Sequence, residues 1–324
     1  MKIAVTGGSG FLGREIVQHL LEAGHNVIAL SRGQTTRVDF PKSVKFERAD
    51  INDGARLRII FSGCDCVVHC AALSAPWGKR SEFLLQNVEG TQSVVRACAA
   101  ASVQRLIYVS SSSVYFSYAD KLNISETSAL PSPVNVYAES KQKAETEAGK
   151  FVGQLFIMRP RGIYGPGDGH LLPRLLRVMT SKPLPLLRNG QALVDITDVS
   201  VAAEAVVAMV TAPAAQAGTY NISHGEPLCI RELVERIGDG LGIKYQWRAL
   251  PVGVAFAGAR LLEAAARLDP WQREPLVTAY GLGLFGYSHT LDIAKARQHM
   301  KWAPKLSLDE GLARTFAHIR EGAA

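Results

Sequence analysis

The segment KIAVTGGSGFLGREIVQHLLEA, residues 2–23, leads from a short apolar run through a glycine-rich turn into an amphipathic pattern. Residues 2–6 have the apolar, β-branched character of a buried strand. Apolar residues then recur with helical spacing, which predicts a helix over residues 11–23. A strand that passes through glycines directly into a helix is the first unit of a dinucleotide-binding α/β fold.

The glycines of this turn have separate physical roles. The pair Gly7-Gly8 permits the tight turn, Gly10 lets the backbone approach a pyrophosphate, and Gly13 lets helix and strand pack closely. The helix N-terminus adds free N–H groups and the positive end of the helix dipole. A plain strand–helix turn is the structural alternative. The residues predicted to bind the cofactor here are Gly7, Gly10, Phe11, Leu12 and Gly13.

The first half of the chain repeats this alternation, which predicts an α/β fold with a Rossmann doubly wound parallel sheet. After Pro160 glycines and prolines become frequent. We therefore predict a dinucleotide-binding domain in residues 1–164 and a smaller C-terminal α/β substrate lobe, mostly residues 165–324. The predicted strands are residues 2–6, 26–30, 44–48, 66–70, 106–110 and 155–159, with helices over 11–23, 82–101 and 137–152 and two segments, 194–197 and 219–223, that return to the main sheet.

The composition is that of a globular protein with a substantial core. Hydrophobic residues make up 47% and charged residues 20%, and the net charge of +7 is scattered without a basic run. Such interleaved charge is typical of a solvated surface and argues against a nucleic-acid partner. The apolar stretch 251–259 falls far short of the about 20 residues that cross a bilayer. It predicts either a packed helix or a membrane-touching surface, but no membrane span.

The five cysteines are odd in number, and Cys64, Cys66 and Cys70 lie close together in one apolar stretch. They make a poor disulfide framework and predict a reducing, cytoplasmic location. The Cys and His residues have no spacing that matches a metal site. The residues from Met1 lead directly into the first strand without a cleavable signal, which agrees with the expected cytoplasmic location. From the Cys and His spacing we expect no metal.

The choice of cofactor depends on the end of the second strand, which reads Ala29-Leu30-Ser31-Arg32. No carboxylate is present there to bond a ribose 2′-hydroxyl, whereas Arg32 can pair with a 2′-phosphate. This predicts NADP(H) rather than NAD(H), with a solvated Arg32 as the alternative. Further predicted cofactor contacts are Ser31, Asp50, Ile51 and the small residues Ala71 and Ala72. Asp50 could hydrogen-bond the adenine amino group, and the alternative is that it only caps a helix.

Of the nine tyrosines, Tyr137 alone has a lysine four residues later, at Lys141. This spacing puts both side chains on one face of the predicted helix. A phenol with a pKa of about 10 is a poor acid or base at neutral pH, and a neighbouring ammonium lowers that pKa. We expect Lys141 also to bind the nicotinamide ribose. The strand before this helix ends in the serines 110–113, one of which should polarise the substrate oxygen.

Taken together, the glycine turn, the serine-rich strand end, the Tyr137–Lys141 pair and RPRGIYGP at 159–166 resemble the extended short-chain dehydrogenase/reductase superfamily, over nearly the whole chain. The family pattern puts a catalytic Ser or Thr four residues before a Val-Tyr tyrosine, which implies Ser111. The resemblance also implies a homodimer formed through helices 82–101 and 137–152. The implied catalytic set is Ser111, Tyr137 and Lys141, with Ser110, Tyr137, Lys141 and Pro160 beside the cofactor.

The chain departs from the nucleotide-sugar epimerase and dehydratase branch of that superfamily. Gly162 stands where that branch has a substrate-binding Asn, and Val194 replaces the Arg that grips a pyrophosphate. Ser112-Ser113 replaces the Asp-Glu pair of dehydratases. The segment 159–168 is instead similar to the 3β-hydroxysteroid dehydrogenase branch, which includes sterol-4-carboxylate dehydrogenases and bacterial 2-alkyl-3-oxoalkanoate reductases.

The resemblance implies an NADP(H)-dependent oxidoreductase that interconverts a ketone and a secondary alcohol on an apolar substrate of the 3-hydroxysteroid or β-keto acid type. The substrates of these relatives carry a carboxylate, which predicts Arg161 or Arg80 as its partner, with a surface salt bridge as the alternative. The predicted substrate contacts are Trp77, Arg80, Ser112 and Arg161. Two other functions stay open, a nucleotide-sugar epimerase with the same triad and a non-catalytic NADP-sensing regulator.

Overall fold

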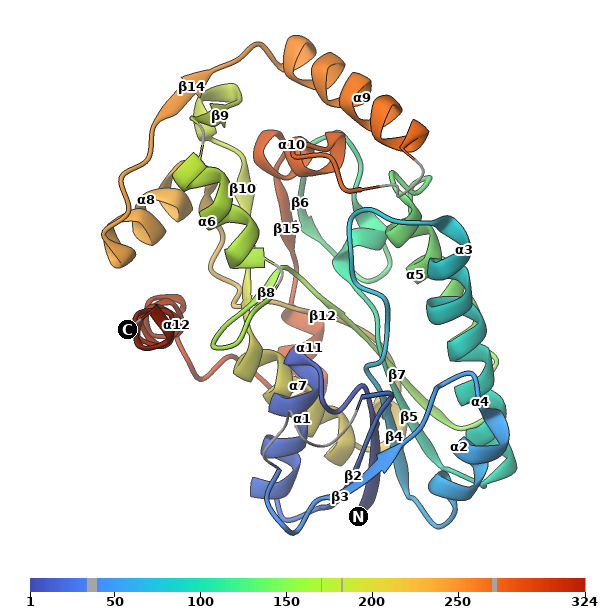
Figure 1. The fold of residues 1–324 in the computed structure, drawn as a ribbon. Helices are drawn as coiled ribbons and strands as arrows, with labels where there is room; N and C mark the ends of the chain where they lie inside the picture. The colour runs from blue at the N-terminus through green and yellow to red at the C-terminus, as the bar shows by residue number, and fades with distance from the viewer. Residues whose placement is uncertain (34–39, 170, 182, 270–272, 324) are drawn as a thin grey trace.

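The computed structural model describes residues 1–33, 40–169, 171–181, 183–269 and 273–323. Within these residues a sheet of seven parallel strands forms the centre of the molecule, in the order β12-β7-β5-β4-β1-β2-β3 (Figure 1). The order reverses between β1 and β4, so the predicted Rossmann fold is confirmed. The strands are β1 Lys2–Thr6, β2 Asn26–Ser31, β3 Lys45–Arg48, β4 Cys66–His69, β5 Arg105–Val109, β7 Gln154–Pro160 and β12 Gly218–Ile222.

Helices cover both faces of this sheet, which explains why β4 and β5 are buried along their whole length. Helix α1 packs with α7 on one face, and α2 and α5 each pack against α4 on the other. Helix α1 turns Leu12, Ile16 and Leu20 inward because their spacing puts them on one side. These helices are α1 Phe11–Glu22, α2 Gly54–Phe61, α3 Arg80–Phe83, the π-helical segment Leu84–Glu89, α4 Gly90–Ala100, α5 Val136–Ala148 and α7 Val199–Thr211.

Several sequence predictions need correction. The helix predicted over 82–101 contains a π-helical segment. The helix predicted over 137–152 ends at Ala148, because Gly149 follows it and Phe151 is buried in the core. The segment 219–223 joins the main sheet as β12, beside β7. The segment 194–197 does not, because it pairs within two smaller sheets.

The second lobe has its own core of aliphatic side chains, contributed mainly by α6, α8 and α12. Its helices are α6 Leu171–Ser181, α8 Ile230–Leu241, α9 Val252–Leu268, α10 Ala279–Gly286 and α12 Leu308–Ala323. Helix α11 Ala294–Met300 packs instead against β12 of the main sheet. Its strands are β6 Lys121–Ile124, β8 Ile163–Tyr164, β9 Leu184–Leu186, β10 Leu193–Val194, β11 Thr197–Asp198, β13 Leu228–Cys229, β14 Trp247–Ala249 and β15 His289–Leu291. The proposed division of function at residue 164 stays a prediction.

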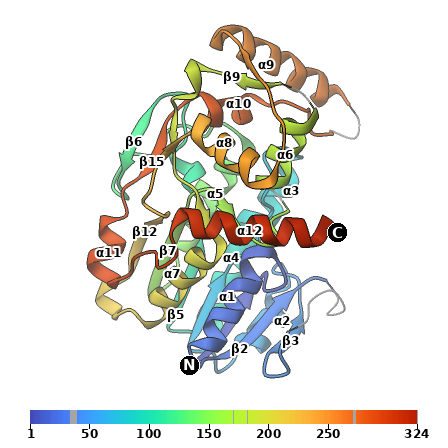
Figure 2. The same ribbon diagram turned by 90° about the vertical axis from the view of Figure 1, so that its left-hand side faces the viewer.

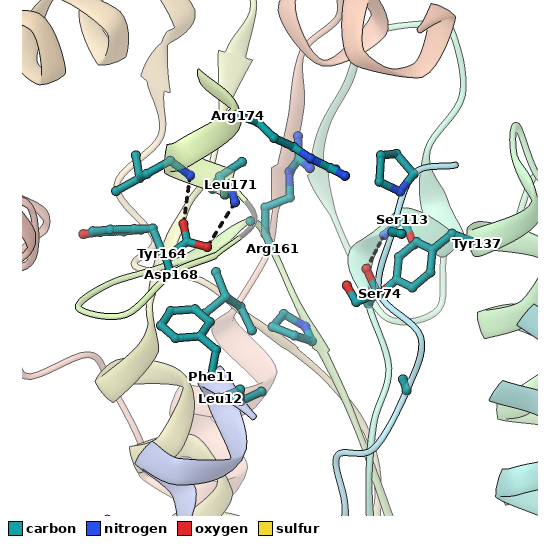
Figure 3. A pocket seen from close by; sticks show the side chains of 18 of the residues that line it. Phe11, Leu12, Ser74, Ser113, Tyr137, Arg161, Tyr164, Asp168, Leu171 and Arg174 are labelled. Atoms are coloured by element: carbon teal, nitrogen blue, oxygen red, sulfur yellow. Dashed lines mark hydrogen bonds between the residues drawn. The ribbon is translucent and has the colours of Figure 1, made fainter. Parts of the chain in front are cut away.

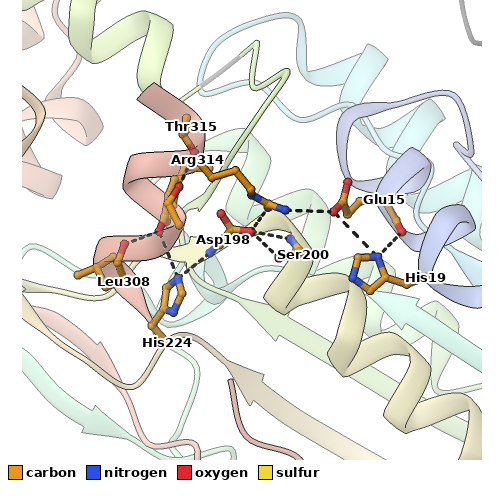
Figure 4. Close-up of polar contacts among 10 residues, drawn as sticks. Glu15, His19, Asp198, Ser200, His224, Leu308, Arg314 and Thr315 are labelled. Atoms are coloured by element: carbon orange, nitrogen blue, oxygen red, sulfur yellow. Dashed lines mark hydrogen bonds and ion pairs between the residues drawn. The ribbon is translucent and has the colours of Figure 1, made fainter. Parts of the chain in front are cut away.

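Helix α12 lies across the boundary between the lobes, below α8 and above α1 in Figure 2. Arg314 of this helix donates to the buried carboxylate of Asp198 at 2.6 Å and lies 3.9 Å from Glu15 of α1 (Figure 4). Asp198 also caps α7 by accepting from the backbone N–H of Ser200. One arginine therefore ties the C-terminal helix to two helices of the sheet domain.

Three further observations concern the chemistry of the described residues. None of their helices has the length and apolar character that a bilayer crossing requires. All five cysteines are described, and each carries a free thiol. Among the same residues, no three His, Cys, Asp or Glu side chains are grouped so that they could hold a metal ion.

Candidate active site

A large cavity of about 1010 Å³ lies at the carboxyl ends of the parallel strands. It runs from the glycine turn after β1, past the ends of β5 and β7, to the space between α6, α8 and α10 (Figure 3). Ligands of doubly wound sheets bind at this edge, where the strand order reverses. The cavity therefore joins a dinucleotide-binding half to a second half that belongs to the other lobe.

The glycine turn is shaped as the sequence predicts. Gly7 has a φ of +70°, and a Cβ on Gly13 would lie only 2.1 Å from the Gly7 carbonyl oxygen. Gly10 precedes α1 without any side-chain cap, and Phe11 and Leu12 line the cavity with it. The first-turn N–H groups of α1 are thus left for a ligand, so this turn fits the pyrophosphate of a dinucleotide.

At the far end of this half, the cavity wall includes Ser31, Arg32, Ile51, Ala71 and Ala72. Ser31 accepts a hydrogen bond from the hydroxyl of Ser9 at 2.6 Å, and the Arg32 side chain is exposed. Asp50 is not among the lining residues, and its carboxylate accepts from the N–H of Asn52 at 2.9 Å. Its predicted contact with adenine stays a prediction.

Ser111, Tyr137 and Lys141 all line the cavity where its two halves meet. Figure 3 shows Tyr137 close to Ser74. The hydroxyls of Ser111 and Ser74 lie close enough to the phenol of Tyr137 to influence its pKa. Burial raises the pKa of Tyr137, while these two hydroxyls act to lower it. The structure therefore brings together a phenol, a strand-end serine and a second hydroxyl from the loop after β4.

The predicted electrostatic effect of Lys141 on this phenol is not found. The Lys141 ammonium is 1% exposed and bonds the carbonyl oxygen of Val109, the last residue of β5. Burial lowers the pKa of Lys141 to about 8, and the pKa of Tyr137 is raised rather than lowered. The reason is geometric, because the ammonium reaches a backbone acceptor at the strand end instead of the phenol oxygen.

A buried asparagine positions the loop that carries Ser74. The Asn87 side chain accepts from the Leu73 N–H at 2.7 Å and donates to the Leu73 carbonyl at 3.1 Å. It also donates to the hydroxyl of Ser140, which in turn donates to the Tyr137 carbonyl. Asn87 lies in the π-helical segment Leu84–Glu89, a feature that often marks functional sites. It thus connects the Ser74 loop to the helix that carries Tyr137.

A second buried network supports the strand end. Glu145 of α5 accepts from both Nε and Nη2 of Arg159, at 2.9 and 2.5 Å. Ser110 lines the cavity and donates its hydroxyl to the same carboxylate. These contacts hold β5, β7 and α5 together, which keeps the adjacent Ser111 and Pro160 in place at the cavity wall.

The half of the cavity in the second lobe is mostly aliphatic and aromatic. Arg161 enters it from below in Figure 3; this residue is 8% exposed, and its Nε has no hydrogen-bond partner. Burial lowers the pKa of Arg161, whereas Tyr280 and Asp195 act to raise it. An unpaired buried guanidinium favours binding of an anion. The aliphatic and aromatic lining residues include Leu171, Leu172, Leu175, Val178, Leu233, Ile237, Leu282 and Phe285.

The other predicted substrate contacts separate into two groups. Ser112 lines the cavity with Arg161, whereas Trp77 and Arg80 are not among the lining residues. Arg80 forms a bidentate ion pair with Glu139 at 2.5 and 3.1 Å on the surface, which is the alternative that the sequence left open. Trp77 lies 5.8 Å below the guanidinium of Arg267. Their predicted roles in binding substrate stay predictions.

Sequence reasoning missed four residues of this site: Ser74, Asn87, Arg174 and Tyr280. A polar Asn87 on the buried side of an amphipathic helix was the one signal that could have been read from local spacing. Arg174 pairs with Glu274 at 2.7 Å at the cavity, and Tyr280 lines the cavity near Arg161 and Tyr137. Neither has a local sequence signature, because both reach the cavity from helices of the other lobe.

Comparison with known proteins agrees with this architecture. The family model described as "NAD dependent epimerase/dehydratase family" matches residues 3–223. The chain is 31% identical to a 2-alkyl-3-oxoalkanoate reductase of Shewanella oneidensis, over 97% of this chain and 85% of that one. It is 32% identical to a mouse decarboxylating sterol-4-alpha-carboxylate 3-dehydrogenase, over 99% of this chain and 92% of that one.

The solved structures that resemble the chain share its fold from end to end. MoeE5, in complex with UDP-glucose and NAD, has a TM-score of 0.78 at 25% identity, with 100% of both chains covered. A UDP-glucose 4-epimerase of Thermotoga maritima has a TM-score of 0.76 at 21% identity, again over 100% of both chains, and shows the fold alone. With its family match and its reductase and dehydrogenase relatives, the chain is an enzyme that belongs to the NAD dependent epimerase/dehydratase family, in the 3β-hydroxysteroid dehydrogenase-like branch.

Proposed function

We propose that the protein is an NADP(H)-dependent oxidoreductase that interconverts a ketone and a secondary alcohol on an apolar substrate bearing a carboxylate. The observation that carries this proposal is the meeting of Tyr137, Ser111 and Ser74 at the junction of the two cavity halves. On one side lies the glycine turn, and on the other an aliphatic wall with a buried, unpaired Arg161. The reacting carbon of a substrate would lie between them.

The cofactor half is proposed to hold the dinucleotide through Gly7, Gly10 and Gly13, with the N–H groups at the start of α1 facing the pyrophosphate. Arg32 lies in the cavity wall after β2, where its guanidinium can pair with a 2′-phosphate. When bound, the reduced cofactor supplies a hydride to the carbonyl carbon. We infer NADP(H) from Arg32 and from the absence of a carboxylate in Ala29-Leu30-Ser31-Arg32.

The chain's own residues handle the proton. In the direction of reduction, Ser111 donates a hydrogen bond to the substrate oxygen, and Tyr137 delivers its phenolic proton to that oxygen. Tyr137 is protonated at neutral pH, as a proton donor must be, but its raised pKa makes the phenol a weaker acid. The Lys141 ammonium stabilises the phenolate that remains, and its three N–H donors allow it to bind the cofactor ribose while it keeps the Val109 carbonyl.

The substrate class follows from the second half of the cavity and from the relatives. Aliphatic walls favour an alkyl or ring system, and Arg161 favours a carboxylate close to the reacting carbonyl. The names of the relatives describe a 2-alkyl-3-oxoalkanoate and a sterol-4-alpha-carboxylate, both of which fit these requirements. We therefore infer a β-keto acid or 3-hydroxysteroid type of substrate.

A nucleotide-sugar epimerase is the competing function, since the solved structures of this fold include enzymes with bound UDP-sugars. Gly162 and Val194, which replace the Asn and Arg of that branch, both line the cavity. A diphosphate there would lose its guanidinium partner, which disfavours this function. The homodimer and the cytoplasmic location inferred from the sequence stay predictions.

The proposal is tested by following NADPH oxidation with a panel of β-keto acids, 3-ketosteroids and neutral aldehydes, beside NADH as the alternative cofactor. Turnover of carboxylated apolar ketones with NADPH is expected. A rise in melting temperature with UDP-glucose, beyond that produced by the cofactor, would indicate the epimerase instead. Cofactor-dependent conformational change without turnover of any substrate would indicate the regulator.

For the cofactor preference, Arg32→Ala should weaken NADPH binding by about tenfold or more, as expected for loss of a charge-assisted pair, and leave NADH binding unchanged. Arg58→Ala is a matched control, because Arg58 is an exposed arginine of α2 outside the cavity. Equal binding of the two cofactors by the parent protein would remove the NADP(H) assignment.

A further inference from the structure

Helix α9 presents an unusually apolar face to solvent. Of its residues Val252–Leu268, two are fully buried, Phe256 and Ala259. On the opposite side Val254 is 64% exposed, Leu261 72% and Leu268 86%. These three positions are seven residues apart, and Gly258 and Ala265 fill the turns between them, so they form one continuous stripe along the helix.

The charges of α9 are arranged around this stripe in a consistent way. Its single acidic residue, Glu263, is turned inward and accepts from the Ala279 N–H at 2.7 Å. Its two exposed charged residues are the arginines Arg260 and Arg267. The solvent side of α9 is therefore apolar, flanked by cations and free of carboxylates on the helix itself.

The position of α9 connects this face to the cavity. The helix lies on the outside of the molecule, at the end farthest from the N-terminus in Figures 1 and 2, and packs on α10. Leu276, between α9 and α10, is 50% exposed and also lines the cavity. The Arg267 guanidinium stacks near Trp77, whose neighbours Ala75 and Pro76 line the cavity as well. One rim of the cavity therefore lies beside the end of α9 that carries Arg267.

We propose that α9 binds the surface of an anionic lipid bilayer, with the stripe Val254, Gly258, Leu261, Ala265 and Leu268 inserted at the headgroup boundary. A helix in this position buries its apolar side to a depth of about 5–10 Å while cationic residues meet anionic headgroups. Arg260 and Arg267 supply that charge. The surface would bring the cavity rim at Leu276 to the acyl chains, a consequence that rests on the proposed apolar substrate.

A second copy of the chain fits the stripe less well. The helix has 17 residues and is about 25 Å long, and Gly258 and Ala265 leave the stripe narrow on either side of Leu261. A stable dimer buries about 800 Å² on each partner, more than the stripe of one helix of this length supplies. The arginines would also find no carboxylate partner on a facing α9.

The test is cosedimentation of the full-length protein with vesicles of phosphatidylcholine alone or of phosphatidylcholine with phosphatidylglycerol. Binding to the mixed vesicles is expected, with weaker binding to phosphatidylcholine. The double variant Leu261→Gln, Leu268→Gln should reduce the partition coefficient at least about tenfold. The double variant Arg260→Gln, Arg267→Gln should remove the preference for anionic vesicles. Each arginine is expected to contribute about a fivefold increase in the partition coefficient for these vesicles.

Ile59→Gln and Val152→Gln are matched controls, because both residues are highly exposed outside α9 and should leave vesicle binding unchanged. Equal melting temperatures verify that the variants fold. Absence of vesicle binding, or equal binding by the Leu261→Gln, Leu268→Gln protein, overturns the proposal. Conversion of a dimer to a monomer by that variant would identify a second copy as the occupant. No substrate or turnover enters the measurement, so its result is independent of the proposed function.

Discussion

The ammonium of Lys141 donates a hydrogen bond to the carbonyl oxygen of Val109 at 2.7 Å and lies 4.4 Å from the centre of the Tyr108 ring. This contact occurs at the end of β5, directly before the serines 110–113. The side chain is almost completely buried, and burial lowers the pKa of Lys141 to about 8 although Glu145 opposes the shift. The fold therefore buries an ammonium whose charged form is destabilised by the loss of hydration, on the helix that also carries Tyr137.

Replacing this lysine should separate stability from activity. Lys141→Met is expected to lose most turnover but to raise the melting temperature at pH 7 by a few degrees, because it removes the desolvation penalty of a buried ammonium. In the unfolded state the lysine side chain has a pKa of about 10.4 and therefore stays protonated up to that pH. Between pH 8 and that value the native state binds fewer protons, so wild-type stability rises with pH. The advantage of the variant should therefore be largest below pH 8 and shrink above it.

Differential scanning calorimetry at pH 7 and pH 10 measures this effect. Lys143→Met is the matched control, since Lys143 lies two residues later on α5 and makes an exposed ion pair with Glu139. A stability difference that is independent of pH would contradict the assignment of a buried, charged Lys141.

The pH dependence of catalysis has the same origin. We expect kcat/KM for ketone reduction to fall as pH rises through about 8, because the Lys141 ammonium is lost while Tyr137, with its raised pKa, stays protonated. Lys141→Arg keeps its charge and should lack this alkaline limb, whatever its activity. A wild-type profile that is flat to pH 10 would exclude Lys141 as the titrating group.

Tyr137→Phe removes the proposed proton donor without changing the size of the ring. Turnover should fall by about 10²–10⁴-fold, while the dissociation constant of NADPH changes little. Steady-state kinetics and a fluorescence titration measure the two quantities separately. Tyr245→Phe, in the second lobe and outside the cavity lining, should leave both unchanged. Comparable activity of Tyr137→Phe and wild type would refute the mechanism.

Arg161→Met should raise KM for a carboxylated ketone by about tenfold or more, as expected for loss of a charge-assisted contact, and affect a neutral ketone much less. Arg80→Ala is the internal control, because Arg80 pairs with Glu139 on the surface and is absent from the cavity wall. If both ketones lose affinity equally, Arg161 acts on the shape of the cavity rather than on the carboxylate.

The link between α12 and the sheet domain depends on Arg314. Arg314→Ala leaves the fully buried carboxylate of Asp198 without its cationic partner, so the free energy of unfolding should fall by about 1–3 kcal/mol. Urea denaturation gives the value. Arg236→Ala breaks only exposed ion pairs with Glu232 and Asp309 and should cost less than about 1 kcal/mol. Equal losses for the two variants would show that Asp198 does not need its partner.

The sheet could be predicted closely because its signals are local. Six of its strands lie within one residue of the ranges read from apolar runs, and the glycine turn has the backbone that its sequence requires. The seventh strand was recognised in 219–223, but 194–197 was placed in the wrong sheet. Short apolar runs establish that a strand exists, but its partner is selected by packing over long chain distances.

The sequence by itself determined the fold class, the glycine turn, and Tyr137 and Lys141 as neighbours on one helix face, because each depends on residues a few positions apart. Only the tertiary structure decided that Ser74 reaches the Tyr137 phenol, that Lys141 turns to Val109, and that Arg161 rather than Arg80 enters the cavity. These contacts join segments that are distant along the chain. Their geometry is selected by the packing of strands, helices and loops as one body, which no local spacing encodes.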